Sequence, residues 1–138
     1  MIDLYNWHTS NGRKLFIMLE ELGADYNTHA INIMKDDQFT PEFLAINPNG
    51  KIPGMIDQDG PGGEPFSLFE SGAMLMYLAD KYGRFLPPVD DIRNRYITLQ
   101  WLMSHVKRLI VSMVYRDGGV TLYRKASHPV SHYRWQEP

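Results

Sequence analysis

Hydrophobic and polar positions in residues 1–33 follow the period of a strand at first and then that of a helix. Residues 2–7 (IDLYNW) predict a short strand, and from Asn11 onward the apolar side chains recur on one helical face that ends near Leu22. Gly23 follows and is typical of a helix C-terminus. Residues 26–33 (YNTHAINI) are a weaker strand candidate, so the chain is expected to begin strand, helix, strand.

The next part of the pattern predicts a short helix between two prolines and then a pair of strands. Thr40 and Pro41 suit the cap and the first position of a helix, and Pro48 stops it. Residues 51–57 (KIPGMID) and 65–70 (PFSLFE) are strand candidates. The loop between them is rich in glycine and proline, which favours an antiparallel pair.

Two further helices complete the pattern. Residues 71–82 are apolar on nearly every side except at Asp80 and Lys81, and they end at Gly83, so this helix is expected to be buried. A linker follows, and Asp90 or Asp91 is expected to cap a helix over residues 92–103. The order β-α-β-α-β-β-α, followed by a linker and a helix, predicts a small α/β fold, although the order of strands within the sheet stays open.

The composition removes several classes of function. The 138 residues include no cysteine, which excludes disulfides, thiolate zinc sites and a redox-active thiol carried by the protein. The net charge of −2 offers no general attraction for nucleic acid. No basic segment followed by an apolar run opens the chain, and no apolar stretch approaches the roughly 20 residues of a membrane span. We therefore expect a cytoplasmic protein that binds no membrane, no nucleic acid and no metal.

The charge is divided unevenly along the chain. Residues 1–103 carry 8 Lys/Arg and 14 Asp/Glu, a net charge of −6, whereas residues 104–138 carry 6 Lys/Arg and 2 Asp/Glu, a net charge of +4. In this tail His128 and His132 are separated by Pro129 and make a poor metal site by themselves. Basic and aromatic residues interleave there as in binders of single-stranded nucleic acid, but they are scattered, so a poorly packed segment is expected.

A cluster of small polar residues lies where the first strand gives way to the first helix. Asn11 or Ser10 is suited to cap that helix, and this simple role accounts for the residue types. The same geometry also directs backbone N–H groups and the positive end of the helix dipole at the space above the helix, where an anion such as a thiolate would be stabilised. The residues alone leave both interpretations open.

Two more places combine polar groups with turn geometry. Pro53 follows Ile52 between a loop and a strand; a cis peptide bond there would present the Ile52 backbone to an extended ligand, although an ordinary loop explains the pair more simply. Glu70 and Ser71 end a strand and begin a helix. A carboxylate beside a helix N-terminus suits the ammonium and carboxylate groups of an amino-acid end, while a serine there often does no more than cap the helix.

Together, these segments resemble the glutathione-binding domain of the glutathione transferase family. INPNGKIPGMID (46–57) is similar to the family's cis-proline segment, and FESGAMLMYLADKYG (69–83) is similar to its Glu-Ser motif and the helix after it. TSNGRK (9–14), QFTPEF (38–43) and DGPGGEPFSLFESGA (59–73) resemble the bacterial nu class and the yeast nitrogen-regulator-like branch of the family.

The resemblance implies two parts. Residues 1–86 are implied to form a thioredoxin-like glutathione-binding domain, and residues 87–138 a linker and an incomplete all-α segment. Family members continue with a wholly helical second domain, but the resemblance ends near Ser104. The tail is therefore expected to be truncated, divergent or read from a shifted frame, and a homodimer is expected if the remaining helical segment suffices.

The resemblance also implies that the ligand is glutathione and assigns it to particular residues. Thr9 and Asn11 are implied beside the sulfur as the catalytic residues, with the adjacent Ser10 as a rival to Thr9, while Tyr5 in the first strand is expected to pack there instead. The residues implied to bind the rest of glutathione are Glu70 and Ser71 at its γ-glutamyl end, Ile52 and cis-Pro53 at its cysteinyl part, and Lys51 and Gln38 at its remaining polar groups.

The activity implied for this branch is glutathione-dependent disulfide reduction, with glutathione as co-substrate and no metal. Because the chain lacks cysteine, any exchange must use the thiols of glutathione itself. Conjugation of glutathione to an electrophile is the alternative reaction. A non-catalytic glutathione-binding or regulatory domain is the alternative from another class, and the second substrate, a small disulfide or an electrophile, stays open.

Overall fold

A computed structural model describes the backbone of residues 1–116 and the side chains of residues 1–104. Within these residues the strands and helices follow one another in the order β-α-β-α-β-β-α and then a helix, as predicted. The predictions that fall on residues 117–138, including those for His128 and His132, lie outside the described residues. The elements are β1 (Ile2–Asn6), α1 (Ser10–Leu22), β2 (Tyr26–Ala30), η1 (Asp37–Phe39), α2 (Pro41–Ile46), β3 (Gly54–Asp57), η2 (Pro61–Gly63), β4 (Phe66–Phe69), α3 (Ser71–Tyr82) and α4 (Ile92–Arg116).

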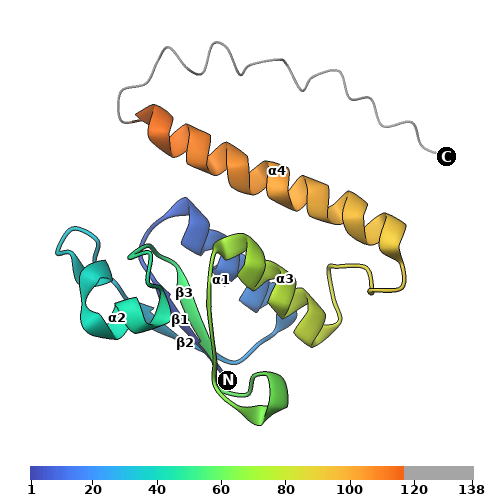
Figure 1. Cartoon of the computed structure of the whole chain (residues 1–138), viewed down its shortest axis with the longest axis horizontal. Coiled ribbons are helices and arrows are strands. Elements are labelled where there is room, and N and C mark those ends of the chain that lie inside the picture. Colours follow the sequence, from blue (N-terminus) through green and yellow to red (C-terminus); the bar gives the residue numbers. More distant parts are fainter. Residues whose placement is uncertain (117–138) are drawn as a thin grey trace.

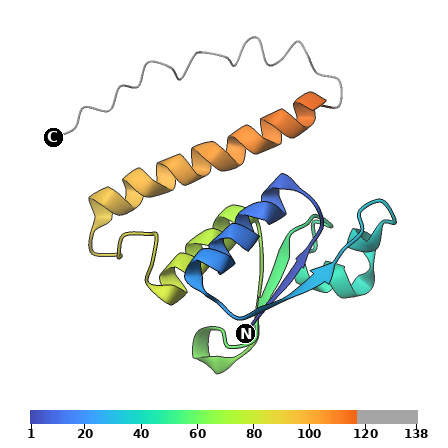
Figure 2. The same ribbon diagram turned by 180° about the vertical axis from the view of Figure 1, so that it is seen from behind.

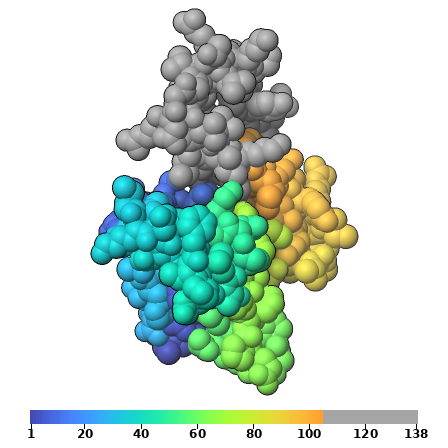
Figure 3. Space-filling view, turned by 60° about the vertical axis from the view of Figure 1, so that its left-hand side comes forward, coloured from blue at the N-terminus to red at the C-terminus, as the bar shows by residue number. Residues whose placement is uncertain are grey.

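The strands form one mixed sheet in the order β2-β1-β3-β4. β1 runs parallel to β2 and antiparallel to β3, and β3 and β4 are the antiparallel pair that the glycine-rich loop predicted. Figures 1 and 2 show α1 and α3 side by side over one face of the sheet, whereas α2 lies on the other face. In Figure 3 the region of η1 and α2, in cyan and teal, lies at the front of the molecule. This arrangement is thioredoxin-like.

The main core lies between the sheet and the two helices α1 and α3. On the opposite face Phe43 and Ile46 of α2 pack against Gly54 of β3, where a Cβ would stand 3.0 Å from the Ile46 side chain. The absence of a side chain at Gly54 therefore lets α2 approach the sheet. The main core comprises Ile2 and Leu4 from β1, Leu15, Leu19 and Leu22 from α1, Met55 from β3, and Met74 and Leu78 from α3.

The cap of α1 differs from the prediction. Thr9, and neither Ser10 nor Asn11, is the N-cap residue, and its Oγ1 accepts a hydrogen bond from the Gly12 N–H at 3.3 Å. Ser10 and Asn11 also have side chains that suit a cap, so the residue types did not distinguish the three candidates. The residue at which β1 ends decides which of them caps the helix. At the other end Gly23 has a positive φ of 65°, as expected for a helix C-terminus.

The helix over residues 71–82 is buried only in part, whereas the sequence predicted a buried helix apart from Asp80 and Lys81. Met74 and Leu78 are fully buried, but Ala73 is exposed and Met76 is only half-buried. The reason is that the sheet lies on one side of α3 only, and the neighbouring helices leave part of its outer face open.

The helix after the linker extends beyond its predicted end at residue 103 and continues to Arg116. Asp91 caps it through a hydrogen bond from the Asn94 N–H to Asp91 Oδ1 at 3.3 Å. Arg95 joins it to α3, since its two terminal nitrogens donate to the Asp80 carboxylate at 2.9 and 2.8 Å. None of the helices within the described residues is long and apolar enough to cross a membrane.

Candidate functional site

The register of the sheet brings the three candidate segments to one end of it. Tyr5 in β1 is paired with Gly54 in β3, and Gly54 is paired in turn with Phe69 in β4. The residues that follow β1, precede β3 and follow β4 therefore lie beside one another at the C-terminal end of β1. These connections contain the small polar cluster, the Ile-Pro pair and the Glu-Ser pair, so segments far apart in the sequence meet at one place.

Thr9 holds the N-terminus of α1 at this end of the sheet. Its hydroxyl oxygen accepts the hydrogen bond from Gly12 described above. A hydroxyl also has one hydrogen to donate, so this bond leaves the Thr9 O–H for an acceptor. The first N–H groups of α1 and the positive end of its dipole face the same region. An anion placed there would meet a hydroxyl donor and a helix N-terminus together.

Asn11 is oriented by Lys14, one turn farther along α1. Lys14 Nζ donates a hydrogen bond to Asn11 Oδ1 at 3.2 Å. Because an ammonium group can only donate, the amide oxygen faces Lys14 and the NH₂ group of Asn11 faces away from it. The contact leaves both amide N–H groups to a ligand, and the neighbouring cation polarises them into stronger donors.

The N-terminal end of α1 carries cations where helices usually carry acids. Its first turn contains no Asp or Glu, and Arg13 and Lys14 follow directly. Partial burial of the Lys14 side chain lowers the pKa of its ammonium group. Cations at the positive end of a helix dipole disfavour the helix itself. The same charges raise the positive potential at the helix end and so favour a bound anion.

The Ile52–Pro53 peptide bond is cis, as the resemblance implied. Pro53 is buried and Ile52 is half-buried. Among the described residues, the backbone N–H and C=O of Ile52 take no part in the hydrogen bonds of turns and caps, and Ile52 lies outside the paired residues of β3. An extended ligand can pair with such a segment as an added strand does.

The loop before the cis-proline is shaped by Asn47, which the sequence analysis did not single out. Asn47 is 3% exposed and uses both ends of its amide: Oδ1 accepts from the Asn49 N–H at 3.0 Å, and Nδ2 donates to the Lys51 carbonyl. Gly50 takes a φ of 59°, and a Cβ there would stand 2.7 Å from the Phe39 ring. The signal in the sequence was INPNG, because Asn, Pro and Gly in succession are typical of turns.

Gln38 and Lys51, implied for the outer polar groups of the ligand, lie around the same loop. The backbone carbonyl oxygen of Gln38 would stand 3.5 Å from a Cβ on Gly50. Gln38 Nε2 donates to Asp36 Oδ1 at 3.4 Å, while its buried Oε1 accepts no hydrogen bond among the described residues. The Lys51 side chain is exposed. The pair thus offers one unsatisfied acceptor and one cation beside the cis-proline loop.

Glu70 has an uncommon backbone conformation at the junction of β4 and α3. Its φ of 69° and ψ of 110° lie in a region that residues with side chains rarely adopt. The Glu70 side chain is exposed and makes no capping hydrogen bond to α3, and Ser71, which begins the helix, is 5% exposed. Strain of this kind persists where the surrounding structure enforces it, and it is concentrated at functional sites.

Tyr5 packs on its neighbour His29, as the sequence analysis expected. The two rings are stacked with centroids 4.4 Å apart. Burial and the nearby Asp3 carboxylate raise the pKa of Tyr5. A raised pKa opposes the phenolate form, so Tyr5 is poorly suited to act on a thiol as a phenolate anion.

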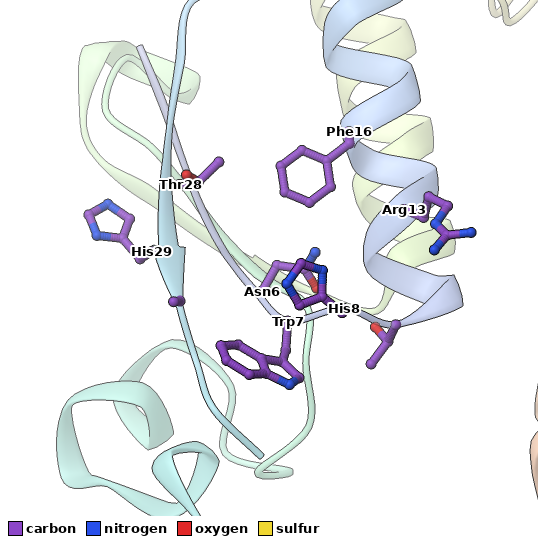
Figure 4. Close-up of a pocket in the computed structure, with 9 residues that line it drawn as sticks. Asn6, Trp7, His8, Arg13, Phe16, Thr28 and His29 are labelled. Carbon is purple, nitrogen blue, oxygen red and sulfur yellow. The ribbon is translucent and has the colours of Figure 1, made fainter. Parts of the chain in front are cut away.

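A pocket of about 250 Å³ opens beside α1, between this helix and β2 (Figure 4). Of its residues, only Thr9 was singled out from the sequence. The others belong to segments that approach one another only because β2 pairs with β1 beneath α1. The pocket is lined by Asn6, Trp7, His8, Thr9, Arg13, Phe16, Thr28, His29 and Ala30.

Comparison with known proteins matches residues 1–80 to the family model of the glutathione S-transferase N-terminal domain. Among curated proteins, the chain is 51% identical over 107 residues to the disulfide-bond oxidoreductase YfcG of Escherichia coli, covering 77% of this chain and 49% of that protein. It is 44% identical over 107 residues to the disulfide-bond oxidoreductase YghU of E. coli, covering 73% of this chain and 36% of that protein. The chain therefore spans half or less of these relatives.

Solved structures of glutathione transferases are also similar to this chain. A glutathione transferase family member from Pseudomonas fluorescens with two glutathione bound is 52% identical, with a TM-score of 0.71 over 74% of this chain and 44% of that one. A glutathione transferase from Pseudomonas putida with one glutathione disulfide bound per subunit is 51% identical, with a TM-score of 0.70 over the same shares of the two chains, 74% and 44%.

Proposed function

Because the chain belongs to the glutathione S-transferase family, we propose that it binds glutathione at the C-terminal end of β1 and reduces small disulfides with the bound thiolate. One observation carries the proposal: the sheet register joins the N-terminus of α1, the cis-proline loop and the Glu70–Ser71 junction. The curated relatives named disulfide-bond oxidoreductases support the choice of reaction.

The proposed complex places each end of glutathione against a complementary group. The exposed Glu70 carboxylate faces the ammonium of the γ-glutamyl end, while Ser71 and the N-terminus of α3 face its carboxylate. The Ile52 backbone pairs with the cysteinyl part. Lys51 and Gln38 bind the remaining polar groups, including the glycyl carboxylate. The sulfur then lies over the N-terminus of α1.

Thr9 and Asn11 are the residues proposed to stabilise the thiolate. A cysteine-type thiol has a pKa near 8.5 in water, and each unit by which the pKa is lowered corresponds to about 1.4 kcal/mol in favour of the anion. The Thr9 hydroxyl and the Asn11 amide each donate one hydrogen bond, and the dipole of α1 with its adjacent cations adds to them. Together these groups are expected to lower the thiol pKa by about one to two units.

Glutathione supplies every electron in the proposed reaction, because the chain has no cysteine. A glutathione thiolate attacks one sulfur of the substrate disulfide, forming a mixed disulfide and releasing a thiolate that takes a proton from water. A second glutathione thiolate attacks the glutathione sulfur of the mixed disulfide, so glutathione disulfide and the second substrate thiol leave. The solved relatives with two glutathione molecules and with glutathione disulfide bound support both steps.

The test follows oxidation of glutathione by hydroxyethyl disulfide in the presence of the full chain. A rate above that of protein-free buffer is expected, and equal rates would refute disulfide reduction. Calorimetric binding of glutathione without turnover would favour a non-catalytic binding domain instead. Turnover of chlorodinitrobenzene alone would favour conjugation, the alternative reaction, and no binding at all would refute the glutathione site.

We extend the proposal to a homodimer in a reducing compartment such as the cytoplasm, where glutathione stays in the thiol form. Apolar side chains on α4 are exposed, among them Ile92 at 64% and Tyr96 at 66%. Exposed apolar groups in one region favour association with another surface. Light scattering after size exclusion, over a range of concentrations, distinguishes the monomer from the dimer.

A further inference from the structure

We propose that the pocket beside α1 binds an anionic aromatic group of the disulfide substrate and so sets the substrate preference of the reaction. The inference rests on the function proposed above, and it names the second substrate as a class: disulfides that carry a carboxylated aromatic ring. The argument uses the charge of the pocket, its walls, one unsatisfied polar atom and its position beside the reacting sulfur.

The lining of the pocket has one arginine, Arg13, and no carboxylate. His29 is already paired with Asp3 at 2.9 Å, which leaves Arg13 and His8 as the groups that can meet an anion. Among the described residues the Arg13 side chain makes no ion pair and is exposed. A guanidinium group binds a carboxylate with two parallel hydrogen bonds, and the dipole of α1 adds positive potential at the same place. The pocket therefore favours a carboxylate.

Two aromatic side chains give the pocket apolar walls. Figure 4 shows Phe16, from α1, and Trp7, from the connection after β1, at opposite ends of the pocket, with Asn6 between them in this view. Planar ligand groups pack well between such rings, because aromatic faces and edges attract one another beyond the burial of their area. The walls therefore favour a flat ring over a flexible aliphatic chain.

Asn6 adds a polar group that the protein itself does not satisfy. This residue is 6% exposed, and its Oδ1 accepts no hydrogen bond among the described residues. A buried acceptor without a donor is uncommon in folded proteins. A water molecule that a bound ring holds in the pocket would supply the missing donor, whether or not the ring carries a charge.

Thr9 connects the pocket to the chemistry. It lines the pocket and also caps the helix end over which the glutathione sulfur is proposed to lie. A carboxylated ring held by Arg13, between Trp7 and Phe16, would bring its disulfide toward Thr9. The bound glutathione thiolate then attacks one substrate sulfur and forms a mixed disulfide with it, and the other substrate sulfur leaves as a thiolate.

The first test measures binding to the full chain without glutathione, so it does not depend on catalysis. Calorimetry compares benzoate with benzamide, which has the same ring but no charge. Benzoate is expected to bind the parent chain and to shift the Trp7 indole resonance in an NMR spectrum. Benzamide is expected to bind the parent chain about tenfold more weakly than benzoate. Benzoate is expected to bind Arg13→Gln about tenfold more weakly than the parent chain. Arg93→Gln is the matched control, since Arg93 is exposed on α4 and lies outside the pocket.

The second test compares kcat/KM for dithiodibenzoate with kcat/KM for hydroxyethyl disulfide. This ratio is expected to fall about tenfold in Arg13→Gln and to keep its value in Arg93→Gln. Equal binding of benzoate and benzamide, or a ratio that Arg13→Gln leaves unchanged, would overturn the inference while reduction of hydroxyethyl disulfide still stood. If neither disulfide is reduced, the proposed function fails, and the binding test still decides the chemistry of the pocket.

Discussion

The side-chain amide of Asn6 lies directly against Gly12, so close that a Cβ on Gly12 would stand 1.9 Å from Asn6 Oδ1. Gly12 is buried in the first turns of α1, and its φ is not in the left-handed region. α1 therefore needs glycine here because a side chain would not fit, and not because the backbone takes an unusual angle. The contact allows the N-terminus of α1 to approach the end of β1, which is where the proposed glutathione site lies.

Replacement of Gly12 by alanine is therefore expected to destabilise the protein. Alanine favours an α-helix by about 1 kcal/mol over glycine, but overpacking of a buried site costs about 1–3 kcal/mol. The overlap with Asn6 makes the larger figure the better estimate, and urea unfolding of Gly12→Ala measures it. The double variant Asn6→Ala/Gly12→Ala has room for the methyl group, so it should lose less stability than the two single changes added together; strict additivity would contradict the contact.

Thr9→Ala is expected to lower the rate of disulfide reduction about tenfold or more and to raise the pKa of bound glutathione by about one unit, because one donor to the thiolate is lost. The pH dependence of thiolate absorbance measures this pKa. Loss of the cap also lowers the free energy of unfolding by about 1 kcal/mol. Thr9→Ser keeps the hydroxyl and should keep both properties. Ser10→Ala is the comparison: if it alone slows the reaction, the assignment to Thr9 is wrong.

Lys14→Met is expected to lower kcat about fivefold while the dissociation constant of glutathione stays nearly unchanged. The reason is that Lys14 holds the Asn11 amide oxygen and so directs the NH₂ group of Asn11 away from Lys14, toward the proposed thiolate. One charge-assisted hydrogen bond near the surface has an effect of this size. Lys14→Arg retains a donor and should recover most of the rate. Lys35→Met, at an exposed position outside the site, is the control. A parallel loss of affinity would indicate that Lys14 binds glutathione directly.

Glu70→Gln is expected to weaken glutathione binding about tenfold, since the ligand ammonium loses its carboxylate partner. The strained backbone at position 70 is unchanged in this variant, so the fold should be preserved. Glu64→Gln removes a charge from another exposed residue and serves as the control. Calorimetry gives both affinities, and equal affinities for the two variants would exclude Glu70 from the ligand site.

The stability of the protein is expected to fall in acid because of Asp57, a fully buried residue at the end of β3. Burial opposes its ionisation, but hydrogen bonds from Lys81, Tyr77 and the Asp59 N–H outweigh that effect and lower the pKa of Asp57. A carboxylate with a lowered pKa stabilises the fold fully above its ordinary value of about 3.9 and loses this contribution as the pH falls through the lowered pKa.

Lys81→Met tests this relationship. Without the ammonium group the pKa of Asp57 should rise, so acid unfolding should begin at a higher pH than in the parent protein. The free energy of unfolding at neutral pH should fall by about 2 kcal/mol, because a buried charge loses a partner. Urea unfolding at a series of pH values from neutral to acidic gives both the free energy of unfolding and the pH at which acid unfolding begins. If stability falls at the same pH in the parent protein and in Lys81→Met, the role of Lys81 is refuted.

The sequence by itself determined most of the elements, because their signals are local. The helical period up to Leu22 and the prolines around α2 placed those helices, and the glycine-rich loop after Asp57 predicted the antiparallel pair. The resemblance to the family, carried by short motifs, named the cis-proline and the thioredoxin-like fold before the structure showed them.

Other features depend on which segments meet in space, and only the tertiary structure decided these. Thr9 rather than Ser10 or Asn11 became the cap, because β1 ends at Asn6 and sets where α1 begins. The pocket around Arg13 formed because β2 pairs with β1 under α1. Side-chain types and periods report the neighbours of a residue along the chain, whereas a cap, a pocket wall or an unpaired buried oxygen depends on neighbours that the fold supplies.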